Sequence, residues 1–185
     1  MAMTEPWQTA EIAGPLQANA ITKPEVVVSL IKQSKRPILV VGHKVIEEFE
    51  TSSEPIECII ALARAGNIPL VATAHVVKDF LEHGYHPSAS MPAVDIANRL
   101  RDSSWKGLDD SGSYDLLLIL GLPYYMEWLI LSGLKHFAKD LILISLDRFY
   151  QPHATWSFPN ISFEKWVDNF TVIIDKLRGK RNVNV

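Results

Sequence analysis

The chain has 185 residues, of which 48% are hydrophobic and 21% are charged, so its composition is that of one globular domain rather than a disordered segment. A formal net charge of −3 gives no indication of a nucleic-acid or anionic membrane partner. Because Cys58 is the only cysteine, the chain alone holds no internal disulfide, CxxC zinc site or iron–sulfur cluster. It shows no signal-peptide pattern and no apolar run of about 18 residues, so we expect a cytoplasmic protein without a membrane span.

Residues 1–22 mix prolines, a glycine and isolated apolar side chains without a clear period. A disordered arm is usually more polar than this. We therefore expect an N-terminal arm that lies either on its own domain or on a partner. Trp7 and Ile12 are its candidate contact residues.

A helix is predicted to follow the arm. Thr22 is a favourable N-cap, and Pro24 and Glu25 are favourable in a first turn. The helix should end before Pro37, where the run PILVVG (37–42) begins. Such a continuous apolar run, closed by a glycine, is typical of a parallel strand that is buried on both faces.

The alternation of helices and strands then continues to the end of the chain. Further strands are expected at 67–73, 114–121 and 140–147, with a short one near 160–163, and further helices at 53–65, 75–84, 92–102, 123–138 and 164–178. This order predicts one α/β domain over residues 23–178, doubly wound around a mostly parallel sheet with helices on both faces, and a polar tail at 179–185.

Small and polar residues stand where several of these strands end, which is where open α/β sheets bind ligands. We consider a weak nucleotide crevice formed by Gly42, His43, Thr73, Gly121 and Asp147, in which Asp147 accepts hydrogen bonds from ribose hydroxyls. The alternative is that the glycines only turn the chain and Asp147 pairs with its neighbour in sequence. We favour the alternative, because the segment GHKVIEEFE lacks the second and third glycines of G-x-G-x-x-G.

Other chemistry-bearing residues give weaker signals. His83 and His86 lie three apart in HGYHP, but a glycine and a proline there favour a turn over a metal site. Asp109 and Asp110 lie in a glycine- and serine-containing loop, where turn formation accounts for them. No nucleophile with a base partner is apparent, so we predict no catalytic and no metal-binding residue.

The segment PYYMEWLILSGLKHF (123–137) carries large apolar side chains on more than one helical face. A helix that only covers a sheet should show a single apolar stripe. We expect part of this helix to lie in a subunit interface, where tyrosine, tryptophan and methionine are enriched. Tyr124, Tyr125 and Trp128 are our candidates, together with Trp156.

Two resemblances follow from longer stretches. KRPILVVGHKV, ARAGNIPLVATAHVVKDFLEHGYHP and YDLLLILG resemble the central domain of thiamine-diphosphate enzymes, which has the deoxyhypusine-synthase-like NAD/FAD-binding fold. That resemblance implies a six-stranded parallel sheet, and some members of the fold carry FAD or ADP.

The second resemblance covers nearly the whole chain. KRPILVVG, GNIPLVAT, WKGLDDSGSYD, LGLPYYMEWLILSGLKHF and ISLDRFYQPHATWSFPNIS occur in the order found in the epsilon subunit of the archaeal acetyl-CoA decarbonylase/synthase (carbon monoxide dehydrogenase) complex. The last stretch is the most specific, since a fold alone does not demand Tyr150, Ala154, Ser157, Phe158 and Asn160 together.

The family resemblance implies an auxiliary subunit without catalytic residues. Its partner would be the alpha subunit, in an α2ε2 unit of a larger complex, and nickel and iron–sulfur clusters would belong to alpha, which interconverts CO and CO2. Self-association of epsilon is a further expectation. One alternative is a flavin-binding electron-transfer module of the same complex, with FAD at the crevice. The least favoured alternative is a thiamine-enzyme fragment, because the flanking cofactor domains that such an enzyme needs are missing.

Overall fold

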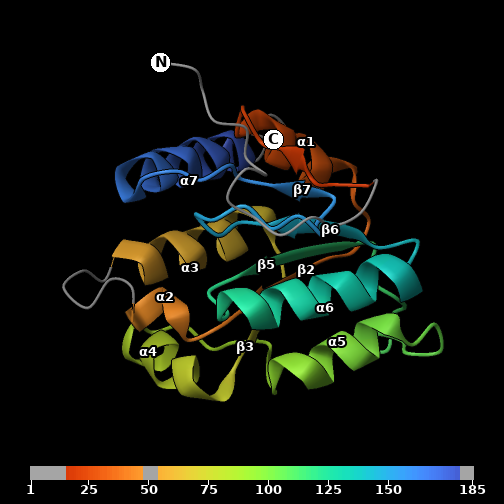
Figure 1. Cartoon of the computed structure of the whole chain (residues 1–185). Coiled ribbons are helices and arrows are strands. Elements are labelled where there is room, and N and C mark those ends of the chain that lie inside the picture. Colours follow the sequence, from red (N-terminus) through yellow and green to blue (C-terminus); the bar gives the residue numbers. More distant parts are fainter. Residues whose placement is uncertain (1–15, 48–53, 180–185) are drawn as a thin grey trace.

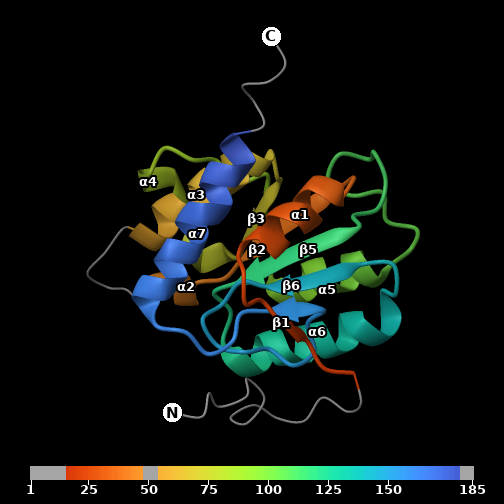
Figure 2. The ribbon, with the colours of Figure 1, turned by 90° about the horizontal axis from the view of Figure 1, so that it is seen from above.

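A computed structural model describes residues 16–47 and 54–179, and Trp7 and Ile12 therefore lie outside the described residues. The sheet has seven strands in the order β1-β7-β6-β5-β2-β3-β4, and every pair is parallel (Figures 1 and 2). The strands are β1 (Asn19–Ala20), β2 (Pro37–Val41), β3 (Leu70–Ala72), β4 (Ala89–Ser90), β5 (Leu116–Leu120), β6 (Ile142–Ser145) and β7 (Trp156–Ser157). The α/β architecture predicted from the sequence is confirmed.

Helices connect the strands and cover both faces of the sheet. They are α1 (Glu25–Gln33), α2 (Lys44–Glu47), α3 (Glu54–Gly66), the short 3-10 helix η2 (Ala74–Val76), α4 (Val77–Glu82), α5 (Ala93–Arg101), α6 (Tyr124–Phe137) and α7 (Phe163–Arg178). Helices α1, α3 and α7 pack against one face, whereas α5 and α6 lie side by side on the other (Figures 1 and 2).

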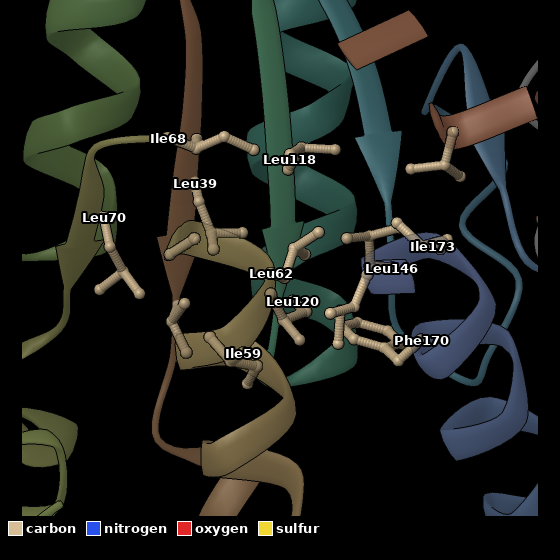
Figure 3. Close-up of a cluster of buried hydrophobic side chains, with 14 of the residues drawn as sticks. Leu39, Ile59, Leu62, Ile68, Leu70, Leu118, Leu120, Leu146, Phe170 and Ile173 are labelled. Carbon is tan, nitrogen blue, oxygen red and sulfur yellow. The ribbon is translucent and has the colours of Figure 1, made fainter. Parts of the chain in front are cut away.

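The central strands bury both of their faces, which explains their continuous apolar sequences. Alternate residues of β2 point to opposite sides, so Leu39 faces the layer of α3 and α7, and Ile38 faces that of α5 and α6. In Figure 3, side chains of β2, β5 and α3 meet those of α7, among them Phe170 and Ile173. All of the residues labelled there are buried.

Three sequence expectations are corrected. The sheet has seven strands rather than six, and β1, β4 and β7, which were not expected, have two residues each and are too short to produce a period. No strand forms at 160–163, since the hydroxyl of Ser162 caps α7 by accepting a hydrogen bond from the amide of Lys165 at 3.3 Å. Thr22 does not cap α1, whose N-cap position is occupied by Pro24.

The last residues assigned to the N-terminal arm join the sheet. Strand β1 pairs with β7, and the amides of Ala18 and Ile21 donate to the carbonyls of Pro152 and Ser157. The hydroxyl of Tyr150 donates to the carbonyl of Ala18 at 2.6 Å. In the part of the arm that the structure describes, the chain therefore lies on its own domain.

Candidate functional site

The strand order reverses between β2 and β5, and the two glycines of the predicted crevice directly follow these strands. The two turns approach so closely that a side chain on either would overlap the other turn. A Cβ on Gly42 would collide with the carbonyl of Gly121 and the side chain of Leu122, and a Cβ on Gly121 would collide with Val45. Gly121 also has a φ of +72°, which favours glycine. Both glycines are thus required by packing.

The amide groups of these turns are already used within the protein. The amide of Gly42 donates to the carbonyl of Leu120 at 2.9 Å, and that of Gly121 donates to both carboxylate oxygens of Asp147, at 2.9 and 3.1 Å. The described cavity between α2 and the ends of β5 and β6 has a volume of about 10 Å³, which is room for roughly one water molecule. Here the glycine turns donate to protein groups, whereas a phosphate-binding loop directs its amides toward a ligand.

The remaining crevice residues lie around the same edge. The rings of His43 and His75, which follow β2 and β3, make an edge-on contact with centroids 5.7 Å apart. Thr73 is buried, its amide donates to the carbonyl of Val41, and its hydroxyl is a buried group without a partner in the described part of the chain. The structure therefore joins Gly42, Gly121 and Asp147 in one contact and places His43 and Thr73 on the neighbouring strand ends.

A feature that we did not predict lies beside Asp147. Glu127, in the first turn of α6, is completely buried, and neither carboxyl oxygen has a hydrogen-bond partner in the described chain. Burial raises the pKa of Glu127 well above its usual value of 4.5, and the negative charge of Asp147 raises it further. The neutral, protonated form of Glu127 is thus favoured beside the Asp147 carboxylate.

Other polar atoms near α6 are also buried. We call Glu127, Trp128, Ser145, Gln151 and His153 the α6 polar cluster; they belong to α6, to the end of β6 and to the segment between β6 and β7. The rings of Trp128 and His153 meet edge-on with centroids 4.5 Å apart, and the amide nitrogen of Gln151 donates to the carbonyl of Tyr124 at 3.2 Å. Each member keeps at least one buried polar atom that is unpartnered within the described residues.

The histidine of the α6 polar cluster is electrically neutral at pH 7. Burial lowers the pKa of His153 below 6.5, and the nearby charges of Lys135 and His136 lower it further. The unpartnered polar atoms of the cluster are buried. Hydrogen bonds from Gln151 to the carbonyl of Tyr124, and from Tyr124 to that of Tyr150, connect the start of α6 with the segment between β6 and β7. The sequence could have indicated this cluster. Glu127 lies on the same helical face as Leu131 and Leu134, which are buried.

The predicted interface residues of α6 and β7 have different environments. Tyr125 is 68% exposed. The half-buried Tyr124 donates its hydroxyl to the carbonyl of Tyr150 at 3.2 Å, and the half-buried Trp128 belongs to the α6 polar cluster. Trp156, also half-buried, packs against the main core.

The outer surface of α6 is apolar. Tyr125, Met126, Leu129 and Phe137 are 68%, 41%, 64% and 67% exposed. We call these four residues, with Gly133, the α6 outer face. No atom lies within 4 Å of a Cβ built on Gly133. Because a glycine inside a helix costs about 1 kcal/mol relative to alanine, and this fold does not require it, its absent side chain indicates room for an external contact.

Features of several other functional classes are missing from residues 16–47 and 54–179. No group of three or more histidine, cysteine or carboxylate side chains is placed to hold a metal ion. No helix in these ranges is long and apolar enough to span a membrane.

This arrangement defines a class of protein: an α/β domain whose strand-end crevice is packed with its own residues and whose most conspicuous surface is an apolar helix. Residues 1–174 match the family model described as CO dehydrogenase beta subunit/acetyl-CoA synthase epsilon subunit. The chain belongs to this family.

The relatives carry a consistent description. The chain is 35% identical over 173 residues to the acetyl-CoA decarbonylase/synthase complex subunit epsilon of Methanothrix soehngenii, covering 93% of this chain and 88% of that one. It is 35% identical over 161 residues to that of Methanothermobacter thermautotrophicus, covering 87% and 89%. It is 39% identical over 158 residues to subunit epsilon 1 of Archaeoglobus fulgidus, covering 84% and 82%.

The close approach of the two turns makes a prediction about glycine replacement. Gly121→Ala should lower the free energy of unfolding by about 3 kcal/mol, because it adds both a strained φ and a steric overlap. Gly84→Ala is the matched control, since Gly84 has a φ of +66° and no atom within 4 Å of an added Cβ. It should cost about 1 kcal/mol. Urea unfolding measures both, and equal losses would show that packing at Gly121 contributes nothing.

The buried acid predicts an unusual pH dependence. The folded state keeps the Glu127 proton that the unfolded state releases near pH 4.5, so stability should fall as the pH rises from there to the folded pKa. In Glu127→Gln this loss should disappear. The difference in the free energy of unfolding between the variant and the unmodified chain should therefore change by up to about 1.4 kcal/mol per pH unit. Urea unfolding from pH 5 to 8 measures it, with Glu82→Gln as an exposed control. A constant difference across that range would contradict a neutral Glu127.

Proposed function

We propose that the chain is a non-catalytic accessory subunit of an acetyl-CoA decarbonylase/synthase complex. It binds and stabilises the metal-bearing alpha subunit in an α2ε2 unit, while alpha carries out CO oxidation and CO2 reduction during reversible acetyl-CoA cleavage and synthesis. Family membership supports the place in such a complex. The exposed apolar face of α6 is the observation that carries the proposed mode of action.

The α6 outer face has the properties of the centre of a protein interface. Tyrosine, methionine and phenylalanine are enriched at such centres. Its helix is held in position from beneath, because Glu127, Leu131 and Leu134 are buried on the opposite side. A rigid helix loses little conformational entropy when it binds, so a larger part of the contact energy becomes affinity. We infer that this surface receives the alpha subunit.

The flavin-binding alternative receives less support from the geometry. A flavin dinucleotide at this edge would need donors for its pyrophosphate, and the amides of Gly42 and Gly121 donate to Leu120 and Asp147 instead. We therefore assign the domain a binding role without a cofactor of its own, and nickel and iron–sulfur clusters belong to the partner. We also propose that this sheet is a member of the deoxyhypusine-synthase-like fold.

Affinity measurements on surface variants test this function. The double variant Tyr125→Ala/Leu129→Ala should weaken binding to the purified alpha subunit by roughly 30-fold or more, as expected when about 2 kcal/mol of central apolar contacts is lost. Both side chains are largely exposed in the free chain, so folding should be unaffected, which circular dichroism checks.

Leu81→Ala is the matched control, because Leu81 is an exposed leucine on a different helix, α4, with 46% of its surface accessible. It should bind alpha like the unmodified chain. Unchanged affinity of the double variant would overturn the assignment of the α6 outer face. If the double variant instead abolished only self-association of the isolated chain, seen by analytical ultracentrifugation, a second copy would be the occupant and the assignment to alpha would be wrong.

A further inference from the structure

A wide cavity lies at the opposite edge of the sheet from the glycine turns. Its volume is about 630 Å³, within the range of small-molecule sites. It opens where β2 begins and where α3 ends. Its lining includes the charged residues Lys35, Arg36, Arg64 and Asp109 and the tyrosines Tyr85 and Tyr114. We call it the amino-edge cavity.

One wall of the amino-edge cavity is an arginine–tyrosine pair in a fixed arrangement. The guanidinium carbon of Arg36 lies 5.1 Å from the ring centre of Tyr114. The Tyr114 hydroxyl accepts a hydrogen bond from the amide of Leu108 at 3.2 Å, and the Arg36 guanidinium pairs with Asp109 at 2.5 Å. The Nε of Arg36 is buried and unpartnered among the described residues.

The second wall repeats the same chemistry with a less constrained pair. The guanidinium carbon of Arg64 lies 5.6 Å from the ring centre of Tyr85, whose pKa is raised by burial although the charge of Arg64 opposes the shift. Arg64 makes no ion pair with the residues that the structure describes. Its guanidinium is therefore available to an incoming acceptor.

The charges around the cavity favour an anion. Lys35, Arg36 and Arg64 are cationic, and Asp109 is the acidic residue of the lining. Arg64 also suits the negative C-terminal end of α3. Stabilising the end of a helix requires neither a tyrosine ring against the arginine nor an open cavity beside it, so this role does not explain the arrangement around Arg64. Arginine binds phosphate through paired donors and stacks on flat rings, so the two Arg–Tyr pairs offer both kinds of contact.

We propose that the amino-edge cavity binds a small organic phosphate that carries a flat ring. The phosphate lies toward the guanidinium groups and Lys35, and the ring packs between the tyrosine faces and the apolar wall of Ile68 and Pro69. This site differs from the strand-end crevice in position and in residues. The cavity shares no residue with the α6 outer face. A test of ligand binding in the cavity is therefore independent of any test of the proposed accessory-subunit function.

Calorimetry on the full chain tests the proposal with adenosine monophosphate as the probe. Inorganic phosphate and adenosine are the comparison ligands, because each lacks one half of the proposed recognition. We expect the monophosphate to bind at least about tenfold more tightly than either, a difference of about 1.4 kcal/mol. If adenosine monophosphate does not bind, or if inorganic phosphate binds as tightly as adenosine monophosphate does, the proposal is overturned.

Substitutions locate the site. Arg64→Ala and Tyr85→Ala should each weaken binding of adenosine monophosphate about tenfold or more, whereas Tyr85→Phe, which keeps the ring, should bind within about threefold of the unmodified chain. Arg101→Ala is the matched control, since Arg101 lies 5.7 Å from the ring centre of Phe137, another cation–aromatic pair outside the cavity. Binding that is insensitive to Arg64→Ala and Tyr85→Ala would place the ligand elsewhere and refute the assignment.

Discussion

The close contact between the backbone turns at Gly42 and Gly121 is the constraint on which the rest of the structure depends. These turns follow β2 and β5, the two strands between which the chain reverses its direction across the sheet. With no side chains between them, Val45 and Leu122 pack directly onto the turns. Asp147 then secures the Gly121 turn from the end of β6 by accepting its amide hydrogen. A place that commonly binds ligands in such sheets is thereby filled by the protein itself.

The same carboxylate connects this edge to α6. Burial and the charge of the neighbouring Asp147 raise the pKa of Glu127, which favours its neutral form, and a buried neutral acid is far less costly than a second buried charge. Hydrogen bonds of Tyr124 and Gln151 then connect the start of α6 with the segment between β6 and β7. Several outward residues of α6 are apolar and exposed. A supported helix with an exposed apolar surface fits the accessory role that we propose.

The sequence predicted the main helices and strands well because their apolar runs are long and bounded by glycine or proline. It failed where a single residue or a distant contact decides the structure. Ser162 converts an apparent strand at 160–163 into the start of α7, and the two-residue strands β1 and β4 exist only through their neighbours.

The candidate site shows the same limits. Gly42, Gly121 and Asp147 could be placed at strand ends from the sequence, but their mutual contact depends on strand order, which the sequence does not display. Glu127 could have been found from its helical face. The residues Tyr150, Ser157 and Asn160, which carried the family resemblance, also have a structural reason: the Asn160 side chain accepts from the amide of Tyr150, and the Ser157 hydroxyl accepts from that of Gln151.

Hydroxyl-radical footprinting of the free chain and of its complex with the alpha subunit would test the central claim most directly. The method reports side-chain exposure, and Tyr125 and Met126 of the α6 outer face are reactive residue types that are exposed in the free chain. Docking through this face predicts that both become strongly protected in the complex, while the exposed Phe149 in the segment between β6 and β7 keeps its reactivity. Complex formation with unchanged oxidation of Tyr125 and Met126 would contradict it.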